Sequence, residues 1–252
     1  MSVQRTDLQG YLDKLLNVAD IRDYCPNGLQ VEGRNVIQKI VTGVTASQKL
    51  IDRAIELQAD AIIVHHGYFW KSESAPIVGM KHKRIHALMT HEINLFAYHL
   101  PLDVHSQFGN NIQLAQLMGV NVVASLGDLC SNAIGLVTEF EQPRSGAEVR
   151  RWLEDLLSFP VIHVEQSRPI KTLALCTGAA QGFIDEVAAL GVDAYLSGEI
   201  SEPTVHAAEE QGLHYFAAGH HATERYGVKA LGEHLAAQFD VAVEFVDLPI
   251  PV

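Results

Sequence analysis

Apolar residues follow two patterns that alternate along the chain. Short continuous runs predict strands, and helical spacing predicts helices. Apolar runs at residues 37–44, 60–64 and 94–97 are typical of buried strands. Helical spacing of apolar residues predicts helices at residues 6–16, 48–58, 80–92 and 110–118, the second with Ser47 as its N-cap. This alternation predicts an α/β fold with mostly parallel sheets and helices on their faces.

The middle of the chain has a weaker pattern. Residues 126–143 show no clean period, although residues 133–140 are compatible with a strand. Ser145 and Glu148 have the spacing of a capping box and predict a helix that ends at Leu157. A short strand is expected at residues 161–164.

The second half of the chain repeats the first. Residues 40–66 align without gaps on residues 173–199, and each copy has the order strand, turn, helix, strand. Identical pairs in this alignment include Ala46/Ala179, Gln48/Gln181, Ile51/Ile184, Asp52/Asp185, Asp60/Asp193 and Ala61/Ala194. We interpret this as internal duplication of an α/β lobe, with chance similarity between two βαβ units as the alternative.

Residues that can bind metals follow three of the expected strands. The pair His65-His66 follows the strand at 60–64, and His99 and Asp103 follow the strand at 94–97. His220, His221 and Glu224 follow a third apolar run at residues 213–218. Because ligands gather at the carboxyl ends of strands in open α/β sheets, we expect these side chains to meet and hold metal ions. A donor set of His, Asp and Glu without cysteine suits Zn, Fe or Mn.

Each part of this set also has a structural interpretation. Adjacent strand residues point to opposite faces, so His65 and His66 converge only if the strand ends there, or else they reach two different metals. Asp103 can cap a turn, Glu224 can stabilise a helix N-terminus, and His99 and His221 can be outer-sphere groups or polar caps. Pro101 argues against a simple helix through His99 and Asp103, which predicts a loop. His220 and Glu224 share a face if they are helical.

Composition narrows the class of protein. The net charge of −12 argues against stable binding of duplex nucleic acid, and the chain has no run of about 20 apolar residues that would span a membrane. Met1 to Tyr11 is polar, which predicts no secretory signal. The three cysteines are far apart and form no CxxC pair, so we expect reduced thiols in a cytoplasmic protein.

Other candidates are weaker. Residues 43–47 form a strand-to-helix turn without a P-loop lysine, and we interpret them as a helix cap. Glu199 takes the place of His66 in the second repeat, either as a carboxylate that faces substrate or as a residue at a helix start. His82, His86 and His91 are expected at the surface.

The motifs together resemble a known family. The segments 62–70, 99–103 and 219–225, with the turn Pro26-Asn27-Gly28, are similar to those of the NIF-three-like family, whose bacterial members are often named GTP cyclohydrolase I type 2 homologues. The resemblance implies two similar, interleaved α/β lobes, residues 1–103 plus 222–252 and residues 104–221, with the metal site in the cleft between them. It implies two divalent ions per chain (Zn, Fe or Mn) and a homohexameric ring. The implied ligands are His65, His66, Asp103, His220 and Glu224.

The expected function is that of a dinuclear metal-dependent hydrolase. A metal-activated water would attack a small-molecule substrate, a nucleotide or related heterocycle; with GTP, ring opening at C8 would release formate. We expect Glu224 to bridge the metals, Asp103 to bind terminally, and His99 to orient a ligand or move a proton, which makes His99 and Glu224 the catalytic candidates. The alternatives are hydrolysis of a phosphoester at the same site and a metal-binding scaffold or regulatory protein without catalysis.

Overall fold

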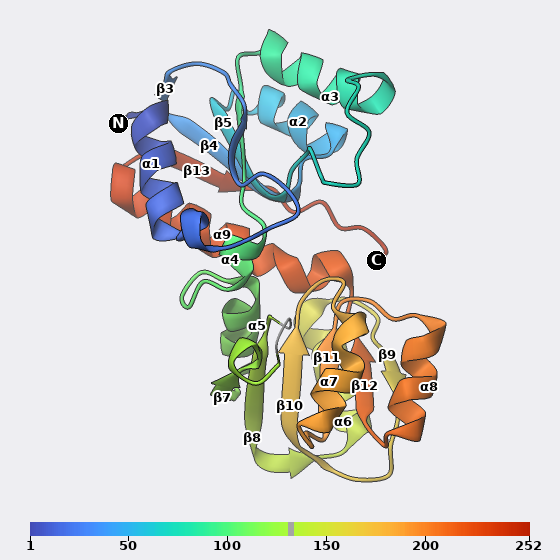
Figure 1. Cartoon of the computed structure of the whole chain (residues 1–252). Helices are drawn as coiled ribbons and strands as arrows, with labels where there is room; N and C mark the ends of the chain where they lie inside the picture. The colour runs from blue at the N-terminus through green and yellow to red at the C-terminus, as the bar shows by residue number, and fades with distance from the viewer. Residues whose placement is uncertain (131–133) are drawn as a thin grey trace. The chain divides into compact units, whose positions relative to one another are not determined.

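The computed structural model describes residues 1–130 and 134–252, which form two compact units (Figure 1). The first unit comprises Met1–Phe108 and Gly227–Leu248, and the second comprises Gly109–Tyr226 and Pro249–Val252. These boundaries lie five residues beyond those expected at 103/104 and at 221/222. The last four residues belong to the second unit, where the His221 N–H donates to the Val252 carbonyl at 3.2 Å.

The first unit is built on a mixed sheet with the strand order β13-β4-β5-β6-β2. Strands β13, β4, β5 and β6 run parallel, and β2 pairs antiparallel with β6. The strands are β1 (Val3–Gln4), β2 (Gly28–Val31), β3 (Val36–Ile37), β4 (Lys39–Thr45), β5 (Ala61–His66), β6 (Asn94–Ala97) and β13 (Ala242–Phe245). The helices are α1 (Arg5–Leu15), α2 (Gln48–Glu56), α3 (Gly79–Thr90), α4 (Leu100–Asp103) and most of α9 (His220–Phe239), with a 3₁₀ turn η1 (Val18–Asp20).

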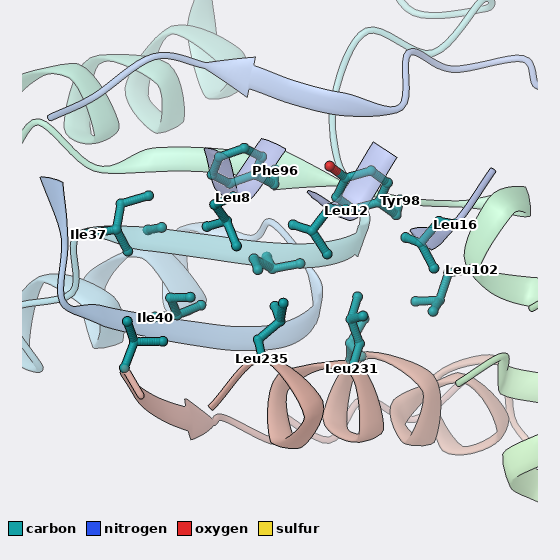
Figure 2. Packing of buried hydrophobic residues seen from close by; sticks show 14 of the residues in the cluster. Leu8, Leu12, Leu16, Ile37, Ile40, Phe96, Tyr98, Leu102, Leu231 and Leu235 are labelled. Atoms are coloured by element: carbon teal, nitrogen blue, oxygen red, sulfur yellow. The ribbon is translucent and has the colours of Figure 1, made fainter. Parts of the chain in front are cut away.

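Alternation along the central strands sends side chains to two cores, one on each face of this sheet. On one face, Ile40 and Ile63 pack with residues of α1 and α9 (Figure 2). On the other, Val41 and Ile62 pack with residues of α2 and α3. Because both faces are covered, these strands are continuously apolar, and their ends are fixed in position.

The second unit repeats this plan around the strand order β7-β8-β10-β11-β12-β9. Strands β10, β11 and β12 run parallel, whereas β7, β8 and β9 are antiparallel to their neighbours. The strands are β7 (Asn121–Ser125), β8 (Leu136–Arg144), β9 (Ile162–Val164), β10 (Ile170–Cys176), β11 (Ala194–Ser197) and β12 (His214–Ala217). The helices are α5 (Asn110–Met118), α6 (Gly146–Leu157), α7 (Ile184–Ala189), α8 (Glu202–Glu210) and the first turns of α9, with 3₁₀ turns η2 (Leu126–Asp128) and η3 (Gln181–Phe183).

The second unit also has two cores, one on each face of its sheet. Residues of α5 and α6 pack with Leu173 and Leu196 on one face, and residues of α7 and α8 pack with Ala174 and Tyr195 on the other. The similarity extends to register, since Ile40 pairs with Ala61 in the first unit and Leu173 with Ala194 in the second. These are aligned positions of the sequence repeat, so the two lobes share one α/β design.

Most expected elements are present, and two expectations about the strand ends are wrong. The strand at 60–64 continues through His66, and residues 100–103 form the short helix α4 rather than a loop. Pro101 fits there because it lies in the first turn, where its missing N–H is not needed. The capping box of Ser145 and Glu148 is present. The strand expected at residues 133–140 is observed as β8, which runs from Leu136 to Arg144, and residue 133 lies outside the described residues. In the described parts of the chain, every helix is too short or too polar to span a membrane.

Candidate metal centre

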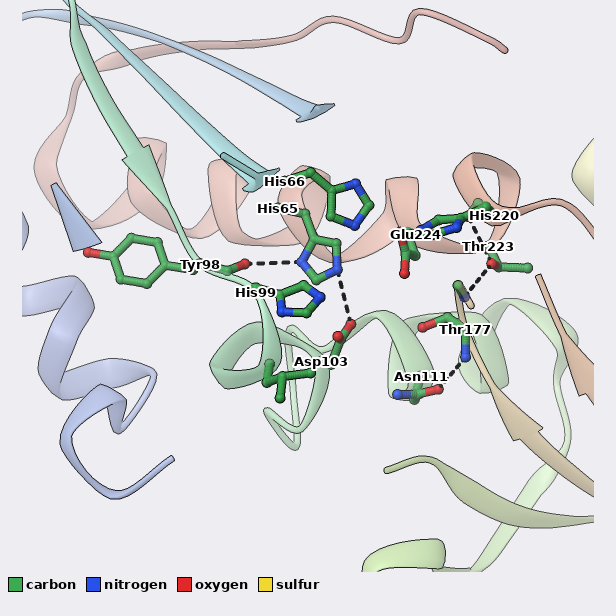
Figure 3. Close-up of polar contacts among 12 residues, drawn as sticks. His65, His66, Tyr98, His99, Asp103, Asn111, Thr177, His220, Thr223 and Glu224 are labelled. Carbon is green, nitrogen blue, oxygen red and sulfur yellow. Dashed lines mark hydrogen bonds and ion pairs between the residues drawn. The ribbon is translucent and has the colours of Figure 1, made fainter. Parts of the chain in front are cut away.

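Three histidines gather at the carboxyl ends of β5 and β6 in the first unit. Ring nitrogens of His65, His66 and His99 lie within 4.8 Å of one another (Figure 3). The ring centroids of His65 and His66 are 4.6 Å apart although the strand includes both residues. Hydrogen bonds to the neighbouring strands explain this: the His65 Nδ1 is 3.0 Å from the Tyr98 carbonyl, and the His66 Nδ1 is 3.2 Å from the Thr45 hydroxyl. Both rings are therefore held at the end of the strand.

Asp103 completes the group in the first unit. It ends the single turn of α4, where its N–H donates to the His99 carbonyl at 3.1 Å. The Asp103 Oδ1 lies 3.5 Å from the His65 Nε2, and both side chains are buried (Figure 3). A buried imidazole nitrogen and a buried carboxylate that face one another provide a cation site at low desolvation cost, because the ligands are already out of water.

Asp23 anchors His99 from the loop before β2. Its carboxylate is buried and accepts from the His99 Nδ1 at 3.0 Å and from the Leu100 N–H at 2.9 Å. Burial opposes the negative charge, but the hydrogen bonds with His99, Asn27 and Leu100 outweigh it and hold the Asp23 pKa well below its usual range. Asp23 is therefore a carboxylate at neutral pH, and it keeps the His99 Nδ1 protonated.

Cys25 shares this loop but stays a thiol. It lies with Asp23 and His99 in a group whose potential ligand atoms are within 4.8 Å. Burial and the nearby Asp23 carboxylate raise the pKa of the Cys25 thiol to about 12. Without a bound metal, Cys25 is therefore a thiol at neutral pH.

The second unit presents His220 and Glu224 from the first turn of α9. Their four-residue spacing brings the His220 Nε2 to 3.0 Å from the Glu224 Oε2, as expected for two residues on one helical face. On the other side of the ring, the His220 Nδ1 donates to Glu199 at 2.7 Å. Burial disfavours the charged imidazole, but the hydrogen bonds and charges of Glu224 and Glu199 raise the His220 pKa to about 9.

The end of β10 makes room for the Glu224 side chain. Gly178 has a positive φ of 68°, and a Cβ at this position would collide with the Glu224 carboxylate. The Gly178 N–H donates to the Thr223 hydroxyl at 3.1 Å, which fixes this loop against α9 (Figure 3). Glycine at 178 thus allows a buried carboxylate to lie against the backbone of β10.

The two groups have the chemistry of metal ligands. In His65, His99 and His220 the Nδ1 faces a carbonyl or carboxylate oxygen, which can only accept, so Nδ1 carries the proton. Neutral imidazoles of this tautomer present Nε2 as the ligand atom; for His220, whose pKa is about 9, a metal would have to displace the Nε2 proton. Outer-sphere carboxylates are typical partners of metal-binding histidines. The residues fit Zn, Fe or Mn.

The sequence candidates fall into three classes in the structure. His65, His66, His99 and Asp103 come together in the first unit, and His220 and Glu224 come together in the second. His221 is buried beside them, whereas His82 and His86 are exposed on α3 as expected. Glu199 lies before α8, whose N-cap is Ser201, and its carboxylate binds His220.

Sequence reasoning missed Asp23. It precedes a Pro-Asn-Gly turn and lies 76 positions before His99 in the chain, so no local spacing connects the two residues. The only signal was the turn itself, since the Asn27 side chain accepts from the His99 N–H at 2.7 Å. Distant pairs of this kind become visible only when the fold is known.

Known proteins resemble the chain over its whole length. A family model described as Duf34/NIF3 (NGG1p interacting factor 3) matches residues 3–250. A Pseudomonas aeruginosa protein named "GTP cyclohydrolase 1 type 2 homolog" is 49% identical over 251 residues and covers 100% of both chains. The solved structure of protein ybgI, described as of unknown function, has 48% identity and a TM-score of 0.95 over 99% of this chain and 100% of its own. That of a Thermus thermophilus protein, TTHA1606, has 34% identity and a TM-score of 0.88 over 99% and 100%. The chain belongs to the Duf34/NIF3 family.

Proposed function

We propose that the chain is a dinuclear metal-dependent hydrolase that acts on a nucleotide or related heterocycle. His65, His66, Asp103, His220 and Glu224 would hold two divalent ions of Zn, Fe or Mn. The observation that carries the proposal is the same in each unit: an imidazole Nε2 faces a buried carboxylate, at 3.5 Å in one and 3.0 Å in the other. The names of its relatives support a GTP cyclohydrolase-like ring opening as the first reaction to test.

The bound ions would supply Lewis acidity and lower the pKa of a water toward ~7. The chain would position the reacting groups. Glu224 is the carboxylate assigned to both ions, and Asp103 is assigned to one. His99, whose Nδ1 proton is committed to Asp23, offers its Nε2 lone pair to accept a proton from water or substrate.

Charge explains why the ions matter for an anionic substrate. The chain has a net charge of −12 and would repel a nucleotide phosphate. Two divalent ions add four positive charges at the site and reverse the local field. Binding of nucleotide should therefore depend on the ions before any chemistry occurs.

Metal analysis and product identification together test the proposal. Protein purified without added metal or chelator should contain about two equivalents of Zn, Fe or Mn per chain and should release formate from GTP. Glu224→Ala should lose metal and activity, whereas His82→Ala, which changes an exposed histidine on α3, should lose neither. A Glu224→Ala protein with two ions and full activity would contradict the bridging role.

The same assay separates the other candidate functions. Release of phosphate instead of formate would identify a phosphohydrolase at this centre. Metal-replete protein that is inert toward a broad substrate panel would favour a scaffold or regulatory role. If the protein binds no metal after anaerobic reconstitution, both the proposed metal centre and the proposed hydrolase activity are wrong.

A further inference from the structure

Two aromatic rings border the histidine cluster of the first unit. Tyr24 lies in the loop that carries Asp23, and Trp70 lies in the loop that follows β5. Their centroids are 5.7 Å apart with an interplanar angle of 38°, so the two rings contact each other at a tilt. Each also contacts the His99 ring edge to face, Tyr24 at 5.1 Å and Trp70 at 5.0 Å. Tyr24 is 53% exposed.

Hydrogen bonds with the backbone hold the Tyr24 loop and the Trp70 indole in place. The Lys71 N–H donates to the Tyr24 carbonyl at 2.8 Å and joins the two loops, and the Tyr24 N–H donates to Asp23 at 2.7 Å. The Trp70 indole N–H donates to the Gly67 carbonyl at 3.1 Å, and Gln30 binds the Tyr68 backbone at 2.7 Å. These bonds fix the backbone at Tyr24 and the indole of Trp70, so a ligand that stacks on Trp70 would cost little side-chain entropy.

Two other aromatic residues have rings that are covered by protein groups. Phe69 lies in the same loop, but the Lys81 ammonium covers its ring at 4.7 Å. In the second unit, Trp152 packs between the Phe140 ring at 5.8 Å and the Arg144 guanidinium at 5.1 Å. Tyr24 differs because its half-exposed ring lies in direct contact with a candidate catalytic histidine.

We propose that Tyr24 and Trp70 form a stacking site for the planar heterocyclic ring of the substrate, the base of a nucleoside or nucleotide. Aromatic faces bind bases by stacking without reading their hydrogen-bonding edges. A ring stacked here would lie beside His99. The assignment of the ligand as substrate rests on the proposed function, whereas stacking itself does not.

Tryptophan fluorescence can test this directly, because the chain has two tryptophans, Trp70 and Trp152. In a Trp152→Phe background, Trp70 is the only reporter. Titration with guanosine should quench its emission saturably, whereas ribose 5-phosphate, which lacks a base, should not. Removing one stacked ring by Tyr24→Ala should weaken guanosine binding about 5- to 100-fold. Tyr24→Phe keeps the ring and should restore binding to near the parent value.

The outcomes separate the stacking site from the proposed reaction. Guanosine binding that depends on Tyr24 in a protein that releases no formate would support the site and leave the proposed function without support. Formate release with a KM for GTP that Tyr24→Ala leaves unchanged would overturn the site alone. Absence of saturable quenching, equal quenching by ribose 5-phosphate, or equal guanosine affinity in Tyr24→Ala and Tyr24→Phe would also overturn it.

Discussion

Each of the two candidate ligand groups contains a histidine bound to a carboxylate through Nδ1. His99 and His220 are both four residues before a candidate carboxylate ligand, and both begin the segment after a parallel strand. Their Nδ1 partners differ: Asp23 reaches His99 from the N-terminal loop, and Glu199 reaches His220 from the position that His66 holds in the other repeat. The two units thus share the order of histidine and carboxylate, whereas the carboxylate that binds the histidine Nδ1 comes from different parts of the chain.

This difference predicts different effects of two matched substitutions. Glu199→Gln removes the charge behind the proposed ligand His220 and should lower metal affinity about 10- to 100-fold. Asp23→Asn acts on His99, which is outside the proposed ligand set, and should keep two ions per chain but slow hydrolysis about 10- to 100-fold. Competition with a chromophoric chelator measures the affinity, and formate release measures the rate.

Exposed Glu210→Gln on α8 serves as the control and should change neither quantity. Loss of an ion from Asp23→Asn protein that remains folded by circular dichroism would instead make His99 a ligand.

A second histidine pair is structural and gives a prediction for acid stability. The His163 Nε2 is 3.0 Å from the His214 Nδ1, which also accepts from the Gln166 N–H at 3.2 Å. Burial and the neighbouring His214 lower the His163 pKa from 6.5 to about 4. Below pH 6.5 the His163 imidazole is protonated in the unfolded chain but remains neutral in the folded chain until about pH 4. The free energy of unfolding should therefore fall between pH 6.5 and 4. After a discount for partial exposure, we expect a loss of about 1 to 2 kcal/mol.

Urea unfolding at pH 7.5 and pH 5 measures this contribution. His163→Gln keeps a donor toward His214 but cannot titrate, and it loses the stacking of His163 on Phe216 at 4.3 Å. We expect this variant to be less stable than the parent at pH 7.5 and the difference to shrink at pH 5. A constant difference across this range would exclude the titration of His163 as its cause.

At the scale of elements, local chemistry determines most of what could be predicted. Strand and helix positions in both repeats follow from hydrophobic period, and the Ser47 cap, whose hydroxyl accepts from the Leu50 N–H at 3.3 Å, follows from residue type. The helix α4 was missed because Pro101 was treated as a helix breaker, although a proline in the first turn breaks no bond. The pairing of His163 with His214 was missed because it depends on β9 lying beside β12.

An aspartate accepts hydrogen bonds from the same turn in both lobes; Asp60 is buried and Asp193 is partly buried. Asp60 accepts from the Gln38 and Lys39 N–H groups at 2.8 and 3.0 Å. Its repeat equivalent Asp193 accepts from the Lys171 and Thr172 N–H groups at 3.0 and 2.9 Å. Each joins the start of one strand to the residue before the next, which explains their identity in the sequence repeat.

Asp60→Ala and Asp193→Ala should therefore destabilise the chain by similar amounts. Each leaves two backbone N–H groups without their acceptor, at a cost of about 2 to 4 kcal/mol. Urea unfolding measures the loss, with Asp52→Ala on the exposed face of α2 as the control that should cost less than about 0.5 kcal/mol. If only one of the two substitutions is costly, the two turns do not share a role.

At the scale of the whole molecule, the chain passes between its two units within one helix. Residues 220–226 of α9 belong to the second unit and carry His220 and Glu224, whereas the rest of the helix places Leu231 and Leu235 in the core of the first. Local patterns identified the candidate ligands of both groups, but their use in a single centre rests on the resemblance to the family and on the proposal.

If the proposed ions take ligands from both units, the folding of each unit should depend on the ions. Ions that bind only when both groups are formed stabilise the folded chain by RT ln(1 + [L]/Kd), about 2.7 kcal/mol at a hundredfold excess over Kd. Trp70 reports on the first unit and Trp152 on the second, so Trp152→Phe and Trp70→Phe proteins follow each unit separately. We expect a chelator to lower the urea midpoint in both proteins. In a Glu224→Gln background the chelator should move neither midpoint, because the shared carboxylate is gone. If the chelator lowers only one of the two midpoints, the ions are held within that unit, and the shared centre is wrong.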